Sequence, residues 1–377
     1  MPNFDQILDN QTINNIRWNT YKDRDVIAMT VADMDFTSPQ PILDALNDVT
    51  NHGIFGYTKP SDELNSLVIK RLAERHHWQV EEVWIIWTPG LVPAITGTCK
   101  AIGGTVLTCT PVYHPFLLAP NWVDVPLKTV PFIEELGRMT FDFKAIENAM
   151  TPDVKLFLLC NPHNPGGMVF RKEELEKLVE ICIKHDIIIC SDEIHCDLIL
   201  DASAKHISVA SLSEEAQNQV ITLLAPSKTF NIAGLGCAFV VIPNPELKAK
   251  FNKATAGFFP QLSRHAYSAA TAAYRDCDDW RLALVQYLKT NHDYLQAEIN
   301  SIKGLKMNTL EATYLAWIDF RESGIENLKA LWEEGGVGVA DGKVYGKEGF
   351  VRMNFGCPKA QLEEAVRRIK RCDNVLI

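Results

Sequence analysis

The sequence predicts an α/β fold with a mostly parallel sheet, covered by helices on both faces, and a second, smaller α/β domain. Between residues 83 and 242, apolar runs of strand length alternate with segments of helical periodicity, as expected for parallel strands joined by helical crossovers. Polar residues directly follow several of these runs, and ligands of such sheets bind at the carboxyl ends of the strands. The 377 residues, 47% of them hydrophobic, suffice for a large core and favour two domains.

Residues 1–45 are expected to contribute to the smaller domain. A short strand is predicted over 27–32, followed by the Asp-Met-Asp-Phe stretch at 33–36. Two acids around a methionine suggest an ordered loop there, and a solvated turn is an equal alternative. Residues 41–50 are expected to form a helix.

Residues 46–280 are expected to form the large domain. Its predicted helices and strands follow one another along the chain: a helix over 62–77, a strand over 83–87, a helix after 90, strands over 106–109 and 155–160, helices over 140–151 and 172–185, and strands over 187–190, 220–225 and 237–242. The last strand begins only about ten residues after the previous one, whereas a parallel crossover needs a dozen or more. We therefore expect the last strand to be antiparallel.

Residues 281–377 are expected to complete the smaller domain. The pattern predicts helices over 281–303, 325–334 and 359–371 and strands over 313–320 and 350–355. Repeats, low-complexity segments and long linkers are not visible in the sequence.

Charge and composition exclude several classes of protein. The net charge of −10 argues against nucleic acid or an anionic membrane as the main partner. The first ten residues carry two aspartates and no apolar core of a signal peptide, and no apolar run approaches the roughly 18 residues of a membrane span. We therefore expect a cytoplasmic protein with no membrane partner.

The cysteines and histidines do not form a recognisable metal motif. The ten cysteines include no CxxC pair and several lie in apolar runs, so we expect them to be reduced and buried. The ten histidines show no HExxH pattern, and the His76-His77 pair is expected on the surface. No metal is therefore expected.

The most unusual stretch is Ala225–Leu235, which reads APSKTFNIAGL and follows a predicted buried strand. A lysine at the end of such a strand is unexpected, because an ammonium group is seldom buried without a partner. Two interpretations are open. Lys228 is either a surface lysine in a polar turn, which is usual for a Ser-Lys pair, or an amine that forms a Schiff base with a carbonyl cofactor.

Two further polar side chains follow other strands of the predicted sheet. Asn164 belongs to a loop with two Asn-Pro pairs and a Gly-Gly pair, which is more constrained than a plain turn requires. Asp192 directly follows the strand at 187–190. Because the carboxyl ends of parallel strands meet at one edge of a sheet, both should lie near Lys228. The turn at Gly90 before a helix could present backbone N–H groups to an anion, although this signal alone is weak.

These residues belong to motifs that resemble a known family over essentially the whole chain. The motifs are VADMDF (31–36), FGYT (55–58), PGLVPAI (89–95), PVYHPF (111–116), CNPHNPGG (160–167), SDEIHCDL (191–198), APSKTFNIAGL (225–235), TYLAWIDF (313–320) and VRMNFGCP (351–358). The chain resembles the fold-type I pyridoxal-phosphate enzymes of the aminotransferase class I/II superfamily. Within it, the chain looks most like the MalY/PatB-like cystathionine β-lyase / C–S lyase branch.

The resemblance implies a cofactor, pyridoxal 5′-phosphate, and roles for the residues near the sheet edge. Lys228 should form the Schiff base and move the Cα proton as general base. Asp192 should pair with the pyridine nitrogen, with a helix N-cap as its alternative role. Asn164 should bind the phenolic oxygen of the ring, and Tyr113 should stack on the ring unless it is a core tyrosine.

Other residues should hold the phosphate. The resemblance implies Ser227 and the backbone N–H groups of Leu91 and Val92. Tyr57 is similar to the tyrosine with which the family reaches the phosphate of the neighbouring subunit, which implies an obligate homodimer with a shared active site. Its alternative is a packing aromatic.

The substrate should also be bound by residues from both ends of the chain. Arg352 should bind the α-carboxylate of an amino-acid substrate, unless it is a surface residue. The loop around Met34 should add backbone contacts to the same carboxylate.

Two positions depart from the broader aminotransferase pattern. His195 stands where many members have a tyrosine, and either reaches the ring oxygen or is a core histidine. Gly236 stands where many members have an arginine for the phosphate. Both departures fit the lyase branch better than a typical transaminase.

The implied function is a C–S lyase, which cleaves sulfur amino acids by α,β-elimination to a thiol, pyruvate and ammonia. No residue fixes the choice between elimination and transamination, so an aminotransferase of class I/II is the alternative. A regulatory protein that keeps only the fold is a further alternative. The preferred thioether is not predicted.

Overall fold

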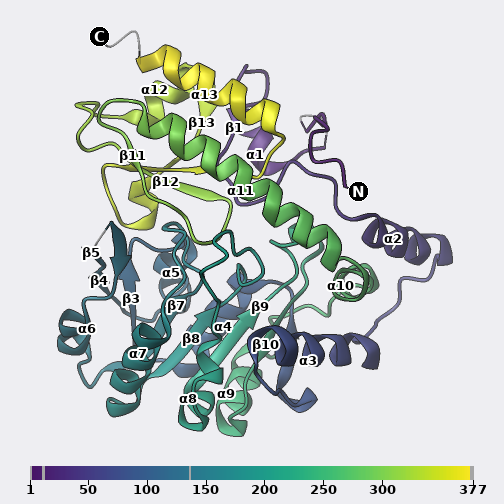
Figure 1. Ribbon diagram of the computed structural model, residues 1–377. Helices are drawn as coiled ribbons and strands as arrows, with labels where there is room; N and C mark the ends of the chain where they lie inside the picture. Colours follow the sequence, from purple (N-terminus) through teal and green to yellow (C-terminus); the bar gives the residue numbers. More distant parts are fainter. Residues whose placement is uncertain (1, 11–12, 136, 374–377) are drawn as a thin grey trace.

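The computed structural model describes residues 2–10, 13–135 and 137–373. The other residues, 1, 11–12, 136 and 374–377, belong to the predicted domain ranges but lie outside this description. Two sheets organise the chain, a seven-stranded sheet in the lower half of Figure 1 and a four-stranded sheet in the upper half. The predicted α/β fold class with a mostly parallel central sheet is confirmed.

The large sheet has the strand order β2-β10-β9-β8-β7-β3-β4. Its strands are β2 (Ile85–Thr88), β3 (Thr105–Thr110), β4 (Leu127–Pro131), β7 (Val154–Cys160), β8 (Ile188–Asp192), β9 (Val220–Leu224) and β10 (Ala238–Val241). Pairing is parallel from β4 to β9, and β10 runs antiparallel to both of its neighbours. The antiparallel orientation expected from the short connection before β10 is therefore confirmed.

Both faces of this sheet are buried, which explains why its strands read as continuous apolar runs. Successive residues of β7 alternate between two cores: Phe157 and Leu159 lie in one, Leu156 and Leu158 in the other. The helices of the first face are α3 (Asp62–His76), α6 (Phe143–Ala149), α7 (Lys172–Lys184) and α8 (Glu214–Gln219), and those of the second are α4 (Leu91–Ile102), α5 (His114–Leu118) and α9 (Pro245–Thr255).

The small sheet is antiparallel, in the order β11-β12-β15-β14. Its strands are β11 (Lys306–Met307), β12 (Leu315–Asp319), β14 (Ala340–Asp341) and β15 (Phe350–Asn354). It shares one core with three helices, α11 (Asp278–Asn300), α12 (Leu328–Glu334) and α13 (Lys359–Asp373). Figure 1 shows α11 and α13 packed along the upper part of the molecule.

The N-terminal segment packs against this C-terminal core. Strand β1 (Ile27–Ala28) pairs in parallel with β13 (Val337–Gly338), and Phe4, Met29 and Met34 belong to the core under the small sheet. The assignment of residues 1–45 to the smaller domain and the boundaries at 45 and 280 stay predictions.

Two more helices, α2 (Gln40–His52) and α10 (Arg264–Asp276), pack on each other, and α10 also contacts α3. Among the described residues, no helix combines the length and the apolar character that crossing a lipid bilayer requires.

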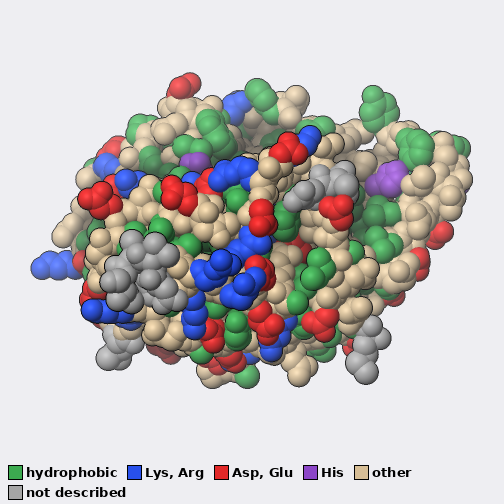
Figure 2. Space-filling model, turned by 90° about the horizontal axis from the view of Figure 1, so that it is seen from above, with side chains coloured by type: hydrophobic (Ala, Val, Ile, Leu, Met, Phe, Trp, Pro, Cys, Tyr) green, Lys and Arg blue, Asp and Glu red, His purple; other side chains and the backbone are tan. Residues whose placement is uncertain are grey.

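The end of the molecule that carries α13 is a surface of mixed charge, where Lys and Arg side chains lie beside Asp and Glu (Figure 2). The Arg368–Asp25 pair at 2.9 Å and the Lys370–Glu298 pair belong to this end.

The structure differs from the sequence predictions at several places. The strand predicted over 27–32 ends at Ala28, because the chain then leaves the sheet as a loop. The edge strand β4 and the exposed hairpin of β5 (Ile133–Glu135) and β6 (Arg138–Thr140) were not predicted, since both lack a fully buried apolar run. The surface prediction is wrong for His76, which is buried against His206, while His77 is exposed.

Candidate active site

The carboxyl ends of three adjacent strands deliver side chains to one cavity. Asn164 follows β7, Asp192 ends β8 and Lys228 follows β9, and all three line a cavity of about 300 Å³. We call it the strand-end cavity. Tyr113, after β3, lines it from the large sheet, and Arg352 of β15 lines it from the small sheet. The convergence expected for parallel strands is therefore present, together with an arginine from the other sheet.

Lys228 is held in the turn that follows β9. Its Nζ donates a hydrogen bond to the carbonyl oxygen of Ala32 at 2.5 Å. Burial lowers the pKa of Lys228 to about 8; the Arg352 charge acts in the same direction, and Asp33 and Asp192 oppose it. An amine with such a pKa gives up its proton far more readily than an ordinary lysine, which suits a nucleophile or general base.

Asp192 is a buried carboxylate in the same cavity, 2% exposed. The backbone N–H of Ile194 donates a hydrogen bond to its Oδ1 at 3.1 Å. Burial raises the pKa of Asp192 to about 7, and the bond from Ile194 and the Lys228 charge oppose this shift. A carboxylate in this setting favours a cationic ligand group, since the cation would offset its desolvation.

Arg352 has a guanidinium group fixed on three sides. Its Nη1 donates to Asn164 Oδ1 at 2.9 Å, and its Nη2 donates to the carbonyl oxygen of Thr30 at 2.8 Å. The group also lies over the ring of Tyr345, 4.7 Å from the ring centroid. Its Nε has no hydrogen-bond partner among the described residues. The cavity therefore contains an oriented cation that suits a carboxylate.

Two side chains with rings, Tyr113 and His195, also line the strand-end cavity. Burial raises the pKa of Tyr113, and the Asp192 charge acts in the same direction, so the phenol stays protonated. Burial lowers the pKa of His195 to about 3, so its imidazole is neutral. Within the described part of the chain, His195 Nδ1 is buried without a hydrogen-bond partner. Both rings can thus offer a neutral polar atom to a ligand.

The remaining predicted residues lie at different distances from this centre. Leu91, the first residue of α4, lines the cavity, whereas Val92 and Ser227 are next to lining residues along the chain. Met34 is buried outside the cavity wall, and its backbone N–H and C=O are bound by Asn231. Tyr57 is 98% exposed and does not line the cavity of its own chain.

Some residues of the site escaped the sequence analysis. Thr30, Val31 and Ala32 line the cavity by their position in the loop before Met34. Tyr345 lines it from the segment before β15, where the sequence has no strand end and no motif. Asn354 lies within a quoted motif, two residues after Arg352, but only the fold reveals that its side chain binds the loop.

A larger cavity of about 650 Å³ lies elsewhere, between the β5–β6 hairpin and the small sheet. Its charged groups largely neutralise one another, as in the Arg321–Asp319 pair at 2.6 Å and the Lys306–Glu134 pair at 3.3 Å. The strand-end cavity combines an amine, a carboxylate and a guanidinium with fewer neutralising partners. It is therefore the better candidate for chemistry.

A buried cluster of His76, Cys196 and Asp197 also deserves comparison, because its ligand atoms lie within 4.8 Å of one another. Arg71 and Arg75 already contact the Asp197 carboxylate at 2.8 and 3.1 Å. Two guanidinium groups at that carboxylate oppose a further cation. We therefore interpret the cluster as a structural ion-pair network.

Comparisons with known proteins agree with this geometry. The family description "Aminotransferase class I and II" matches residues 24–369. Cystathionine beta-lyase PatB of Bacillus subtilis is 36% identical, with 98% of this chain and 99% of that protein covered. The crystal structure of OvoB is 41% identical with a TM-score of 0.96 and covers 98% of both chains. Cystalysin from Treponema denticola, a structure that contains pyridoxal 5′-phosphate, is 30% identical with a TM-score of 0.95 over the whole of both chains.

Proposed function

The chain belongs to the aminotransferase class I and II family, and from this premise we propose that it is a pyridoxal-phosphate-dependent C–S lyase of the cystathionine β-lyase type. The observation that carries the proposal is the convergence of Lys228, Asp192 and Arg352 on one cavity. Full-length similarity to a protein named cystathionine beta-lyase favours elimination over transamination.

The polar side chains of the strand-end cavity match the chemical groups of the cofactor. A buried carboxylate at Asp192 matches a protonated pyridine nitrogen, and the amine of Lys228 matches a carbonyl carbon. The unpartnered Nδ1 of buried His195 is a polar atom that a ring substituent would satisfy. When bound, pyridoxal phosphate supplies an electron sink for the electron pair left at the substrate's Cα.

The residues that would hold the cofactor come from successive strand ends. Asp192 would bind the ring nitrogen and Tyr113 the ring face. Asn164 would bind the phenolic oxygen through its amide nitrogen, because its oxygen already accepts from Arg352. Ser227 and the N-terminal N–H groups of α4, at Leu91 and Val92, would bind the phosphate. Gly236 offers no cation there, so these neutral donors carry that task.

The chain's own charged groups then divide the work on the substrate. Arg352 binds the α-carboxylate and fixes which bond of Cα faces Lys228. Lys228 accepts the proton from Cα, for which a pKa of about 8 leaves a substantial neutral fraction near physiological pH. The carbon–sulfur bond at Cβ breaks as a thiolate leaves, and water then converts the remaining three-carbon unit into pyruvate and ammonia.

A homodimer with shared active sites belongs to the same proposal. The segment after α2 exposes three large apolar side chains, Ile54 at 65%, Phe55 at 62% and Tyr57 at 98%. Adjacent exposed apolar side chains of this kind favour an interface. Tyr57 of each subunit would reach the phosphate in the partner's site. We also place the protein in the cytoplasm, in line with its ten free cysteines, nine of them buried.

The test supplies cystathionine to the loaded enzyme without any 2-oxo acid. Continuous formation of pyruvate, in step with a free thiol, is expected for the lyase. Turnover that appears only after a 2-oxo acid is added would instead identify the aminotransferase alternative. Lys228→Ala should lower pyruvate formation to background and remove the cofactor's visible absorbance band, because no other amine of the described residues lines the cavity.

A further inference from the structure

The loop of residues 30–36, which we call the acidic loop, touches both charged groups that act on the substrate in the proposed function. The carbonyl oxygen of Thr30 accepts a hydrogen bond from Arg352 Nη2 at 2.8 Å. The carbonyl oxygen of Ala32 accepts from Lys228 Nζ at 2.5 Å and from the Tyr314 hydroxyl at 3.0 Å. A shift of this loop therefore moves the acceptors of Lys228 and Arg352 together.

Two asparagines attach the loop to the segments that carry these charged groups. Asn231, three residues after Lys228, accepts from the Met34 N–H at 2.9 Å and donates to the carbonyl oxygens of Met34 and Phe36 at 3.0 and 2.8 Å. Asn354, two residues after Arg352, donates to the carbonyl oxygens of Val31 and Asp33 at 2.5 and 2.6 Å. The loop thus joins the turn after β9 to strand β15.

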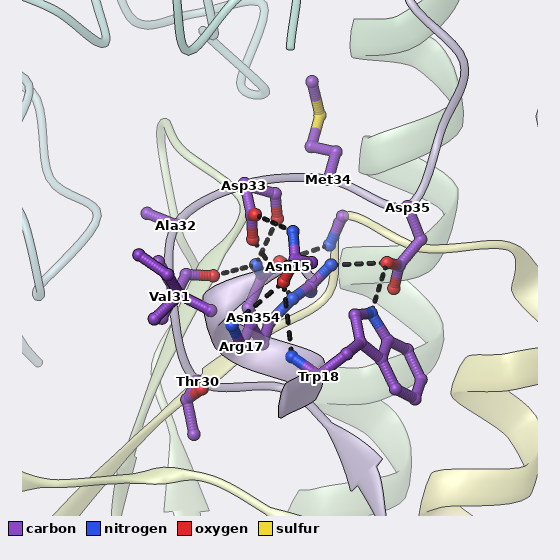
Figure 3. A network of polar contacts seen from close by, with 12 residues as sticks. Asn15, Arg17, Trp18, Thr30, Val31, Ala32, Asp33, Met34, Asp35 and Asn354 are labelled. Atoms are coloured by element: carbon purple, nitrogen blue, oxygen red, sulfur yellow. Dashed lines mark hydrogen bonds and ion pairs between the residues drawn. The ribbon is translucent and has the colours of Figure 1, made fainter. Parts of the chain in front are cut away.

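The two acidic side chains of the loop are held by a buried arginine. Arg17 lies in the short helix α1 (Ile16–Asn19) and is only 1% exposed. Its Nη2 donates to Asp35 Oδ1, and its Nε lies 3.1 Å from Asp33 Oδ1 in an ion pair. Figure 3 shows Arg17 extending between the two carboxylates of the loop. One guanidinium group therefore bridges both acids.

Neutral donors also hold the two carboxylates, two of them from the same segment as Arg17 and one from α13. Asn15 donates to Asp33 Oδ2 at 2.8 Å, and Trp18 Nε1 donates to Asp35 Oδ1 at 3.0 Å (Figure 3). Gln361 of α13 donates to Asp35 Oδ2 at 2.8 Å. Without Arg17 these donors would remain, but the two carboxylates would lose the guanidinium that contacts both of them.

Charge balance explains why such a loss should move the loop. Burial raises the pKa of Asp35, and Arg17 offers the largest opposing influence. Among the acidic groups, Asp33 has the largest effect on Lys228, since it raises the lysine's pKa against burial. Removing the guanidinium would leave two like charges on one short loop, one of them buried, which is strongly unfavourable because the buried charge loses its ionic partner. We therefore expect the loop to shift so that these carboxylates reach solvent.

We propose that Arg17 is a positioning residue of the enzyme: it holds the acidic loop so that the carbonyl oxygens of Thr30 and Ala32 orient Arg352 and Lys228. The inference rests on the proposed function for its kinetic consequence. Its structural consequence, the order of residues 30–36, does not depend on which reaction the enzyme catalyses.

The experiment compares Arg17→Met with Arg17→Lys by steady-state kinetics and by amide hydrogen exchange. Arg17→Met should lower kcat/KM for the thioether substrate by about 10- to 100-fold, mostly through a higher KM, because small displacements of binding groups have effects of this size. Exchange in peptides that cover residues 30–36 should rise, in the loaded and in the cofactor-free protein alike. Arg17→Lys keeps the charge without the planar fork, so it should recover part of both effects.

Arg71→Met is the matched control. Arg71 is a partly buried arginine, with a side chain 12% exposed and an ion pair to Asp197 at 2.8 Å, but it does not line the strand-end cavity. The control should lose stability while KM and the exchange of residues 30–36 stay as in the wild type. A general destabilisation would affect both variants equally and would contradict the proposal.

The outcomes separate this inference from the proposed function. If no thioether is cleaved, the lyase assignment fails, and hydrogen exchange still reports on the role of Arg17. Folded Arg17→Met with wild-type exchange over 30–36 and wild-type KM would overturn the inference. If Arg17→Met cannot be recovered as folded protein, Arg17→Lys carries the test, and wild-type values in that variant would overturn it as well.

Discussion

Burial acts in opposite directions on two charged side chains of the strand-end cavity. It lowers the pKa of Lys228 to about 8 and raises the pKa of Asp192 to about 7. Both groups are thereby brought to the range in which protons are exchanged near neutral pH. Burial thus makes the lysine that follows an apolar strand give up its proton more readily, which is also what a reactive amine requires.

The buried His76 should make the protein sensitive to acid. Burial lowers the pKa of His76 to about 3, below the 6.5 of an ordinary histidine. The unfolded chain therefore binds a proton that the folded protein refuses, and stability that is present above pH 6.5 is lost as the pH falls towards 3. For this one group the loss between pH 7 and pH 5 amounts to about 2 kcal/mol.

The measurement is urea unfolding of the cofactor-free protein at pH 7 and pH 5. His76→Asn should lose about 2 kcal/mol less than the wild type between these two values. The exposed neighbour, His77→Asn, is the matched control and should show the wild-type loss. The groups that face His76, namely His206, Asp197, Arg71 and Arg75, stay unchanged in both variants. An equal pH dependence in all three proteins would contradict the assignment.

At the scale of elements, the turn of residues 233–236 beside the cofactor site requires glycine at its end. Gly236 has φ +62°, and a Cβ built there would approach the carbonyl oxygen of Pro89 at 3.1 Å. Pro89 and Gly90 form the turn that starts α4, whose N–H groups we assign to the phosphate. Gly236→Ala should therefore lower the free energy of unfolding by about 1–2 kcal/mol, the usual penalty for left-handed backbone, and weaken cofactor binding.

Gly234→Ala provides the control within the same turn. A Cβ at Gly234 meets no atom within 4 Å, and the backbone there is not left-handed. Its stability and cofactor affinity should match those of the wild type. Equal effects of the two substitutions, measured by urea unfolding and cofactor titration, would contradict the steric argument.

The elements that the sequence predicted share one property, which is burial on both faces or along one helical stripe. Strands such as β7 and β9 are apolar at nearly every position, so their pattern is visible without any tertiary information. Strand β4 and the β5–β6 hairpin are partly or fully exposed, and their residues do not alternate clearly. Their pairing depends on neighbours that are distant in sequence, which a local pattern cannot reveal.

At the scale of the whole molecule, the sequence predicted the half of the site that parallel topology determines. Asn164, Asp192 and Lys228 had to meet because they follow adjacent parallel strands. The other half depends on how the N-terminal segment packs on the small sheet. The binding of the acidic loop by Arg17, Asn231 and Asn354 joins three distant segments, and none of these contacts has a signature in local sequence.

The assembly prediction follows from the position of Tyr57. Its side chain is 98% exposed and lies outside the cavity of its own chain, so a role at the phosphate requires a second subunit. Tyr57→Ala should bind the cofactor more weakly, and Lys228→Ala should be inactive. Refolding the two variants together produces mixed dimers in which one of the two sites has an intact Lys228 and an intact Tyr57 from the partner.

With random pairing, half of the dimers are mixed, so about one quarter of the wild-type activity should return. Activity is measured at a cofactor concentration where Tyr57→Ala alone is nearly unloaded, and a mixture made without refolding is the control. If Tyr57 acted within its own chain, a mixed dimer would combine one damaged site with one inactive site. Refolding would then give no more activity than the average of the two parents, because no subunit exchange could restore a site.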